Sequence, residues 1–187
     1  LCDEISEAAH VIGAVNVVRR ESDGRMIGDI LDGKGFVAGL LSNDIDPKGK
    51  RVLLAGAGGA ANAIAFALAE AGVGYLGIHN RTTERVHDMI GRLHQVYPHF
   101  NVESVGNNPA GFDVLINATS LGMKDNDPLP LDIAGIGAEQ IVAEIIMKPE
   151  TTALLAQAQA KGCKVQFGLP MLRSQATLMA TFMGISD

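Results

Sequence analysis

The stretch RVLLAGAGGAANAIAFALAEAG, residues 51–72, constrains the fold of this 187-residue chain more than any other. A short apolar run leads into glycines and then into an alanine-rich segment of helical length, which predicts a buried strand followed at once by a helix. Gly56, Gly58 and Ala61 have the G-x-G-x-x-[GA] spacing of a dinucleotide-binding loop. The first glycine permits a tight turn, the second lets a pyrophosphate approach the backbone, and the small third residue lets helix and strand pack closely. The alternative is a tight turn without a ligand.

Short apolar runs continue to alternate with helical segments after this loop, as in YLGIHN, FDVLINA, QIVAEIIM and CKVQF. This alternation predicts an α/β protein with a Rossmann-like, doubly wound parallel sheet covered on both faces. We expect residues 1–42 to form part of a truncated substrate domain with a short helix over 4–11, an Asp-Gly hairpin and a connecting helix. Residues 43–160 would form the nucleotide-binding domain, and residues 161–187 the last strand and a helix returning to the substrate cleft.

Composition excludes several classes of partner. Lys and Arg number 15 against 21 Asp and Glu, and no basic cluster is present, so nucleic acid is not expected. Cys2 and Cys163 form no CxxC motif and the histidines are scattered, so we expect neither a disulfide nor a metal site. Without an apolar run of about 20 residues or a signal peptide, we expect no membrane partner and a cytoplasmic location.

The end of the second expected strand indicates which dinucleotide the loop takes. An NAD site usually places an acidic residue there for the ribose 2′-hydroxyl, whereas arginine suits a 2′-phosphate. Here the strand runs into HNRTTER, which offers Asn80, Arg81, Thr82 and Arg85 and no acid at the decisive place. We therefore predict NADP as the cofactor. The alternative is a surface loop in which Thr82 caps the next helix.

Six stretches together resemble the shikimate dehydrogenase family, in the family's order and over nearly the whole chain. They are GAVN (13–16), DGKGF (32–36), GAGGAA (56–61), NRTTER (80–85), NATSLGM (117–123) and GLPMLRSQ (168–175). The resemblance implies an NADP-dependent oxidoreductase that interconverts 3-dehydroshikimate and shikimate by hydride transfer. It also implies a cofactor domain and a substrate domain that meet at a cleft, and it leaves a homodimer open.

The resemblance assigns site residues on both sides of that cleft. Asn16 and Gln175 would hold substrate hydroxyls, and Asp32 would contact the substrate and polarise a catalytic lysine. The alternative for Asp32 is an N-cap on the helix that starts near Gly33. The cofactor side would consist of Gly56, Ala57, Gly58, Gly59, Ala60, Asn80, Arg81, Thr82, Arg85, Asn117, Ala118, Thr119, Ile145, Gly168 and Met171.

The sequence departs from the family pattern on the substrate side. We expect the family's catalytic lysine upstream of Leu1, so the chain as given would be a cofactor-binding fragment with little activity. Ile30 and Leu31 replace Asn and Thr before the aspartate, and Met147 replaces a substrate-contacting Tyr. These changes favour an altered substrate such as quinate or an amino analogue. Two alternatives stay open: the apolar side chains point into the core, or the chain is a non-catalytic NADP-binding module.

Overall fold

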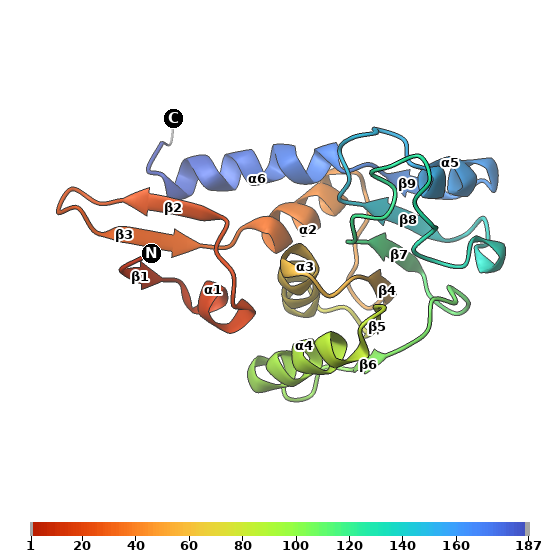
Figure 1. Cartoon of the computed structure of the whole chain (residues 1–187), viewed down its shortest axis with the longest axis horizontal. Coiled ribbons are helices and arrows are strands. Elements are labelled where there is room, and N and C mark those ends of the chain that lie inside the picture. The colour runs from red at the N-terminus through yellow and green to blue at the C-terminus, as the bar shows by residue number, and fades with distance from the viewer. Residues whose placement is uncertain (1, 186–187) are drawn as a thin grey trace.

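The computed structural model describes residues 2–185, which form a six-stranded and a three-stranded sheet with helices around them (Figure 1). In chain order the elements are β1 (Glu4–Ile5), α1 (Glu7–Ile12), β2 (Val17–Arg20), β3 (Met26–Asp29), α2 (Asp32–Ser42), β4 (Arg51–Ala55), α3 (Gly59–Glu70), β5 (Tyr75–His79), α4 (Thr83–Val96), β6 (Val102–Ser104), β7 (Val114–Asn117), the 3₁₀ helix η1 (Ile133–Gly135), β8 (Ile141–Glu144), α5 (Ala153–Ala160), β9 (Lys164–Gln166) and α6 (Leu169–Phe182).

The large sheet is parallel throughout, with strand order β6-β5-β4-β7-β8-β9. Strand order reverses between β4 and β7, and ligands of such sheets bind beyond the carboxyl ends of the strands at this switch point. The predicted Rossmann-like, doubly wound sheet is thereby confirmed.

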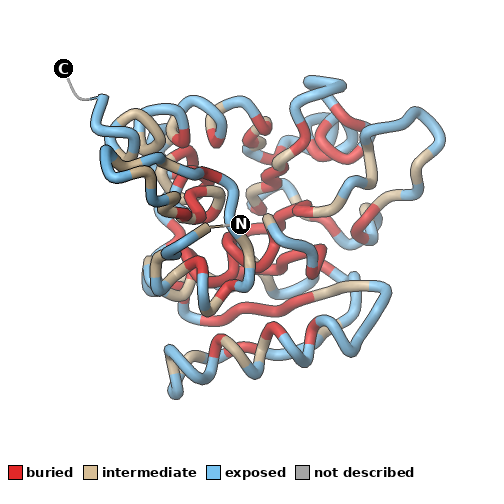
Figure 2. The backbone as a smooth tube through the Cα atoms, turned by 60° about the vertical axis from the view of Figure 1, so that its left-hand side comes forward, coloured by how far each residue is buried: buried red, intermediate tan, exposed pale blue. Residues whose placement is uncertain are grey.

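Both faces of the large sheet are buried, which explains why its strands read as continuous apolar runs. On β4, Val52 and Leu54 belong to the core cluster that includes residues of α3 and α4, while Leu53 and Ala55 belong to the cluster on the α5 side. Figure 2 shows buried backbone running through the middle of the molecule, with mostly exposed loops around it.

Helix α2 connects the small sheet to the large one and is packed tightly between α3 and α6. A Cβ added at Gly33 would lie 2.0 Å from the carbonyl oxygen of Ala63 on α3. A Cβ at Gly35 would lie 2.9 Å from Cβ of Gln175 on α6, and one at Gly39 would meet the backbone at the start of α6. These glycines therefore allow three helices to approach closely, and they bring the polar face of α6 next to the start of α2.

The small sheet has order β1-β3-β2, and its β2–β3 pair is the predicted hairpin around Asp23 and Gly24. The expected helix over residues 4–11 is wrong at its start, because Glu4 and Ile5 pair with β3 as a strand. The side chain of Ser6 accepts a hydrogen bond from the Ala9 amide and caps α1, so the helix begins only at Glu7.

Within residues 2–185, no helix combines the length and apolarity that a bilayer crossing requires. The same residues contain no cluster of three or more His, Cys, Asp or Glu side chains placed to hold a metal ion.

Candidate active site

The glycine loop between β4 and α3 has one crowded side and one open side. Gly56 has φ +122°, and a Cβ there would lie 2.8 Å from the carbonyl oxygen of Ala118, so only glycine fits the turn. Gly58 caps α3 and Gly59 begins it, and a Cβ at either position would meet no atom within 4 Å. Ala61 is fully buried at the helix–strand contact. The start of α3, where the first amides of a helix have no partner within the helix, is thus open beside Gly58 and Gly59, which suits an anionic ligand.

A cavity of about 310 Å³ adjoins this loop. Its lining combines the loop with the end of α1 and with α4, and consists of Ile12, Gly13, Ala14, Ala57, Gly58, Gly59, Asn62, Arg85, Asp88 and Arg92. Arg85 therefore lies beside the glycine loop, as a phosphate-binding role requires. Asp88 contributes a carboxylate to the same cavity.

The loop after β5 carries the polar residues that were predicted to select NADP over NAD. Arg81 is exposed and forms no salt bridge within residues 2–185. Asn80 donates its side-chain amide to the carbonyl oxygen of Thr82 at 3.0 Å, which shapes the turn. Thr82 stands at the N-cap position of α4, but its side chain makes no capping hydrogen bond. Capping therefore does not account for the Thr82 hydroxyl.

Two side-chain amides from distant parts of the chain meet at one carboxylate. The side-chain amides of Asn16, which precedes β2, and Gln175, on α6, both donate to Oδ1 of Asp32, at 2.5 and 2.6 Å. Oδ1 of Asn16 accepts from the Leu31 amide at 2.9 Å, which fixes the orientation of the side chain. No group in residues 2–185 donates to the other carboxylate oxygen of Asp32. The structure thus brings the three predicted substrate residues together and leaves one acceptor free.

The alternative role of Asp32 as an N-cap is wrong. Asp32 is the first residue of α2, and Leu31 holds the cap position without any side-chain capping hydrogen bond. The carboxylate of Asp32 points instead to the amides of Asn16 and Gln175. Its position in the first turn still places a negative charge near the positive end of the helix dipole.

Two of the three apolar departures are buried side chains. Ile30 is 4% exposed and belongs to the main core cluster, and Leu31 is 5% exposed. Their burial where β3 turns into α2 favours the alternative that these side chains point into the core, although Ile30 also lines the cavity of about 250 Å³ between α1, α2 and α3. Met147 differs: it is 44% exposed and lines a cavity of about 350 Å³ with Phe167 and Gly168.

At the end of β8, a buried carboxylate organises the neighbouring loops, and sequence reasoning missed it. Glu144 is fully buried, and its two oxygens accept from Asn117 Nδ2 at 2.9 Å and Thr152 Oγ1 at 2.7 Å. Burial raises the pKa of Glu144 above its ordinary value, although both hydrogen bonds act to lower it. The sequence signal that could have identified it is the single acidic residue within the apolar run QIVAEIIM. Asn117 and Thr119 also bond to each other at 2.7 Å, so the Asn117 side chain supports the loop.

The remaining predicted cofactor residues lie along the same end of the sheet but differ in exposure. Ile145 follows β8 and is half-buried. A Cβ on Gly168 would lie 2.4 Å from the carbonyl oxygen of Ile146, so the chain passes very close to β8 there. Ala118 and Met171 are 8% and 5% exposed, so their side chains shape the protein more than they offer a ligand surface.

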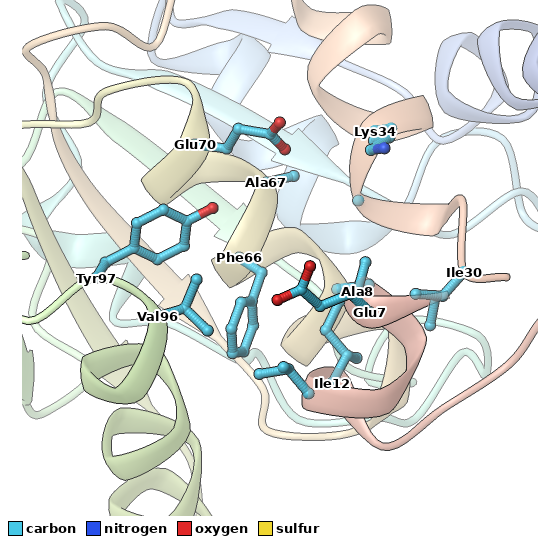
Figure 3. A pocket seen from close by; sticks show the side chains of 13 residues that line it. Glu7, Ala8, Ile12, Ile30, Lys34, Phe66, Ala67, Glu70, Val96 and Tyr97 are labelled. Carbon is cyan, nitrogen blue, oxygen red and sulfur yellow. The ribbon is translucent and has the colours of Figure 1, made fainter. Parts of the chain in front are cut away.

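A separate cavity of about 250 Å³ lies between α1, α2, α3 and the end of α4 (Figure 3). Its lining is largely apolar, with Phe66 and Ile12, while Glu7, Lys34 and Glu70 are exposed around it. None of the residues predicted to bind cofactor or substrate lines this cavity.

Comparison with known proteins agrees with this geometry. A family model described as shikimate / quinate 5-dehydrogenase matches residues 40–123. Shikimate dehydrogenase (NADP(+)) of Bacillus mycoides is 39% identical over 180 residues, covering 94% of this chain and 65% of that protein. The solved shikimate dehydrogenase of Aquifex aeolicus is 34% identical with a TM-score of 0.87, covering all of this chain and 67% of that one. The chain belongs to the shikimate dehydrogenase family. It spans about 65% of the length of the Bacillus mycoides relative.

Within the shikimate dehydrogenase family, neighbours differ in the cofactor with which they were solved. A quinate dehydrogenase from Corynebacterium glutamicum in complex with NAD is 30% identical to this chain, with a TM-score of 0.88, covering 98% of this chain and 67% of that one. The family model covers the glycine loop and the Asn80–Arg85 stretch of this shikimate dehydrogenase family member. The residues around Asp32 lie outside the matched range.

Proposed function

We propose that this chain binds NADP beside its glycine loop and serves a dehydrogenase that interconverts 3-dehydroshikimate and shikimate. The observation that carries the proposal is the carboxylate of Asp32, which two side-chain amides from distant parts of the chain hold with one oxygen free. A carboxylate held in this way can accept a hydrogen bond from a substrate hydroxyl or form an ion pair with an ammonium group. The name of the Bacillus mycoides relative supports the same activity.

The glycine loop and the loop after β5 fit a phosphorylated dinucleotide. Gly58 and Gly59 stand at the positive end of α3 with open space where a side chain would be, and their amides would hold the pyrophosphate. Arg81 and Arg85 would bind the 2′-phosphate by forked hydrogen bonds. When bound, NADP supplies the group that accepts or gives the hydride.

On the substrate side, the chain would orient a hydroxylated cyclic acid. Asn16 is exposed and can exchange hydrogen bonds with a substrate hydroxyl, while Gln175 is buried and holds Asp32 in place. Hydride transfer at a secondary alcohol also needs a group that takes or gives the hydroxyl proton. No lysine in residues 2–185 hydrogen-bonds Asp32, so we expect turnover by this chain alone to be slow.

Quinate or an amino analogue is the second candidate substrate, and Met147 favours it. This side chain is 44% exposed in a cavity that Gly168 also lines, at a position where the family resemblance places a substrate-contacting Tyr. Loss of a phenolic hydroxyl there would weaken selection for a substrate hydroxyl, because sites that bond a hydroxyl discriminate most strongly.

Titration of the chain with NADP and NAD tests the proposed cofactor. Arg81→Ala should weaken NADP binding about 10- to 100-fold, since a hydrogen bond to a charged group contributes about 1.5–3 kcal/mol, and should leave NAD binding unchanged. Arg20→Ala, an exposed position on the β2 hairpin strand, is the control and should change neither. Equal losses for both cofactors would contradict the assignment of Arg81.

Calorimetric titration with shikimate and quinate, in the presence of NADP, tests the substrate side. Asp32→Asn keeps the size of the side chain but removes its charge, so it should weaken binding of the substrate and leave the cofactor affinity unchanged. No binding of either acid by the wild type, with NADP bound normally, would favour a non-catalytic NADP-binding module.

A further inference from the structure

Arg92 on α4 joins two segments that lie far apart in the sequence. Its Nη1 donates to the carbonyl oxygen of Ile12, the last residue of α1, at 2.5 Å. Its Nη2 donates to Oδ1 of Asn62 on α3, also at 2.5 Å. The rigid fork of a guanidinium can serve two acceptors at once, and its charge strengthens both hydrogen bonds. One side chain thus ties α1, α3 and α4 together.

Asn62 extends this connection to the glycine loop. It is 6% exposed, and its Nδ2 donates to the carbonyl oxygens of Gly58 at 2.9 Å and Ala57 at 3.4 Å. Because a guanidinium can only donate, Oδ1 of Asn62 must face Arg92 and the NH₂ group must face the loop. Arg92 therefore sets the orientation of the side chain that holds the loop carbonyls.

The other end of the connection leads to the substrate residues. After Ile12 the chain turns at Gly13, which has φ +75°, and reaches Asn16 three residues later. Asn16 donates to Asp32. A positive charge beside the last carbonyl groups of a helix is favourable, so the Arg92 guanidinium stabilises the end of α1. Gly13, the glycine loop and Arg92 all line the cavity of about 310 Å³.

We propose that Arg92 is a positioning residue that fixes the glycine loop relative to residues 12–16. Occupancy of the loop by a dinucleotide is then coupled to the placement of Asn16 against Asp32. Arg92 acts through Asn62 and the Ile12 carbonyl, because its guanidinium is already bonded to protein acceptors. The coupling to a dinucleotide rests on the proposed function.

A double-mutant cycle with NADPH as the ligand tests this coupling. Arg92→Leu and Asn62→Ala should each raise the Kd about tenfold, near the lower end of coupling between sites, and the double variant should lose no more than either single variant. Arg92→Lys keeps the charge without the fork and should recover only part of the affinity. An unchanged Kd in Arg92→Leu, or losses that multiply in the double variant, would overturn the proposal.

Amide hydrogen exchange without cofactor separates this proposal from the proposed function. Arg92→Leu should speed exchange at Gly13, whose amide bonds to α1, and at Asn62, whose amide bonds to the glycine loop. Arg51→Leu is the matched control, since it removes an arginine bond to a backbone carbonyl at the opposite end of β4 and should speed neither. Faster exchange at only one of the two amides, or the same change in Arg51→Leu, would refute the proposal that Arg92 connects the glycine loop to residues 12–16. Failure of the wild type to bind NADPH would refute the proposed function, while the exchange rates would still decide the role of Arg92.

Discussion

Replacing Gly33 by alanine should destabilise the protein through a single methyl group. The added Cβ would lie 2.0 Å from the carbonyl oxygen of Ala63 and 2.9 Å from Cβ of Ala67, whereas ordinary contact begins near 3.4 Å. The closest obstacle is helix backbone, which cannot rotate away, so α2 and α3 would have to separate by more than an ångström. Overpacking of a core usually costs about 1–3 kcal/mol, and we expect the upper end of this range.

The change is measurable as a shift in the melting temperature. In a domain of this size, 1 kcal/mol corresponds to roughly 2–4 °C, so Gly33→Ala should lower the Tm by roughly 6–12 °C. Gly59→Ala is the matched control, because a Cβ there meets nothing within 4 Å and the residue begins α3. Alanine is the better helix former by up to about 1 kcal/mol, so Gly59→Ala should keep or raise the Tm.

Cofactor titration completes the comparison between the two variants. The Gly59 methyl would project into the open space where a pyrophosphate would approach, so Gly59→Ala should bind NADP at least about tenfold more weakly. A Tm of Gly33→Ala within 2 °C of the wild type, a shift below the roughly 2–4 °C that 1 kcal/mol produces, would refute the reasoning on helix packing. Unchanged NADP affinity of Gly59→Ala would refute the reasoning on the loop.

Three further predictions concern buried groups. Because burial raises the pKa of Glu144 above 4.5, its stabilising contribution is present below that pH and is lost as pH rises through the folded-state pKa. In urea unfolding, the free energy of unfolding of Glu144→Gln should therefore rise relative to that of the wild type as pH rises. A difference between the two that does not depend on pH would contradict this. Ile30→Asn with Leu31→Thr should lower stability by about 2–5 kcal/mol, because both side chains are buried; an unchanged Tm would show that they face solvent. Gln175→Leu removes one donor to Asp32, so calorimetry should show substrate binding weakened about tenfold, the effect of about 1.4 kcal/mol, with NADP affinity unchanged.

The large sheet could be predicted because its signal is local. Val52 and Leu53 face opposite clusters, so a strand buried on both faces must be apolar at every position, and such a run bounded by glycines has few other interpretations. The start of α1 could not be placed in the same way. Glu4 and Ile5 take part in a strand only because β3 lies beside them, and this contact joins residues more than twenty positions apart.

The reason for the glycines of α2 also depends on distant contacts. Gly33 and Gly35 belong to the DGKGF motif and Gly39 follows one turn later, but the partners of these residues lie on α3 and α6. Helix propensity alone would count each glycine as a loss of about 1 kcal/mol relative to alanine. The close approach of Ala63 and Gln175 reverses that judgement, and it can be seen only once the helices are packed.

At the candidate site, the identity of neighbouring residues was predictable but the direction of their side chains was not. Ile30 and Asp32 are two positions apart, yet one lies in the core and the other accepts from Asn16 and Gln175. The chain changes from β3 to α2 between them, so neither the twofold period of a strand nor the 3.6-residue period of a helix applies. Met147 lies in a loop, where no period applies, and it is exposed in a cavity that two loop segments and the start of α6 line. Where a chain changes from one element to another, substrate preference therefore has to be argued from packing, and a polar-to-apolar change alone does not show an altered substrate.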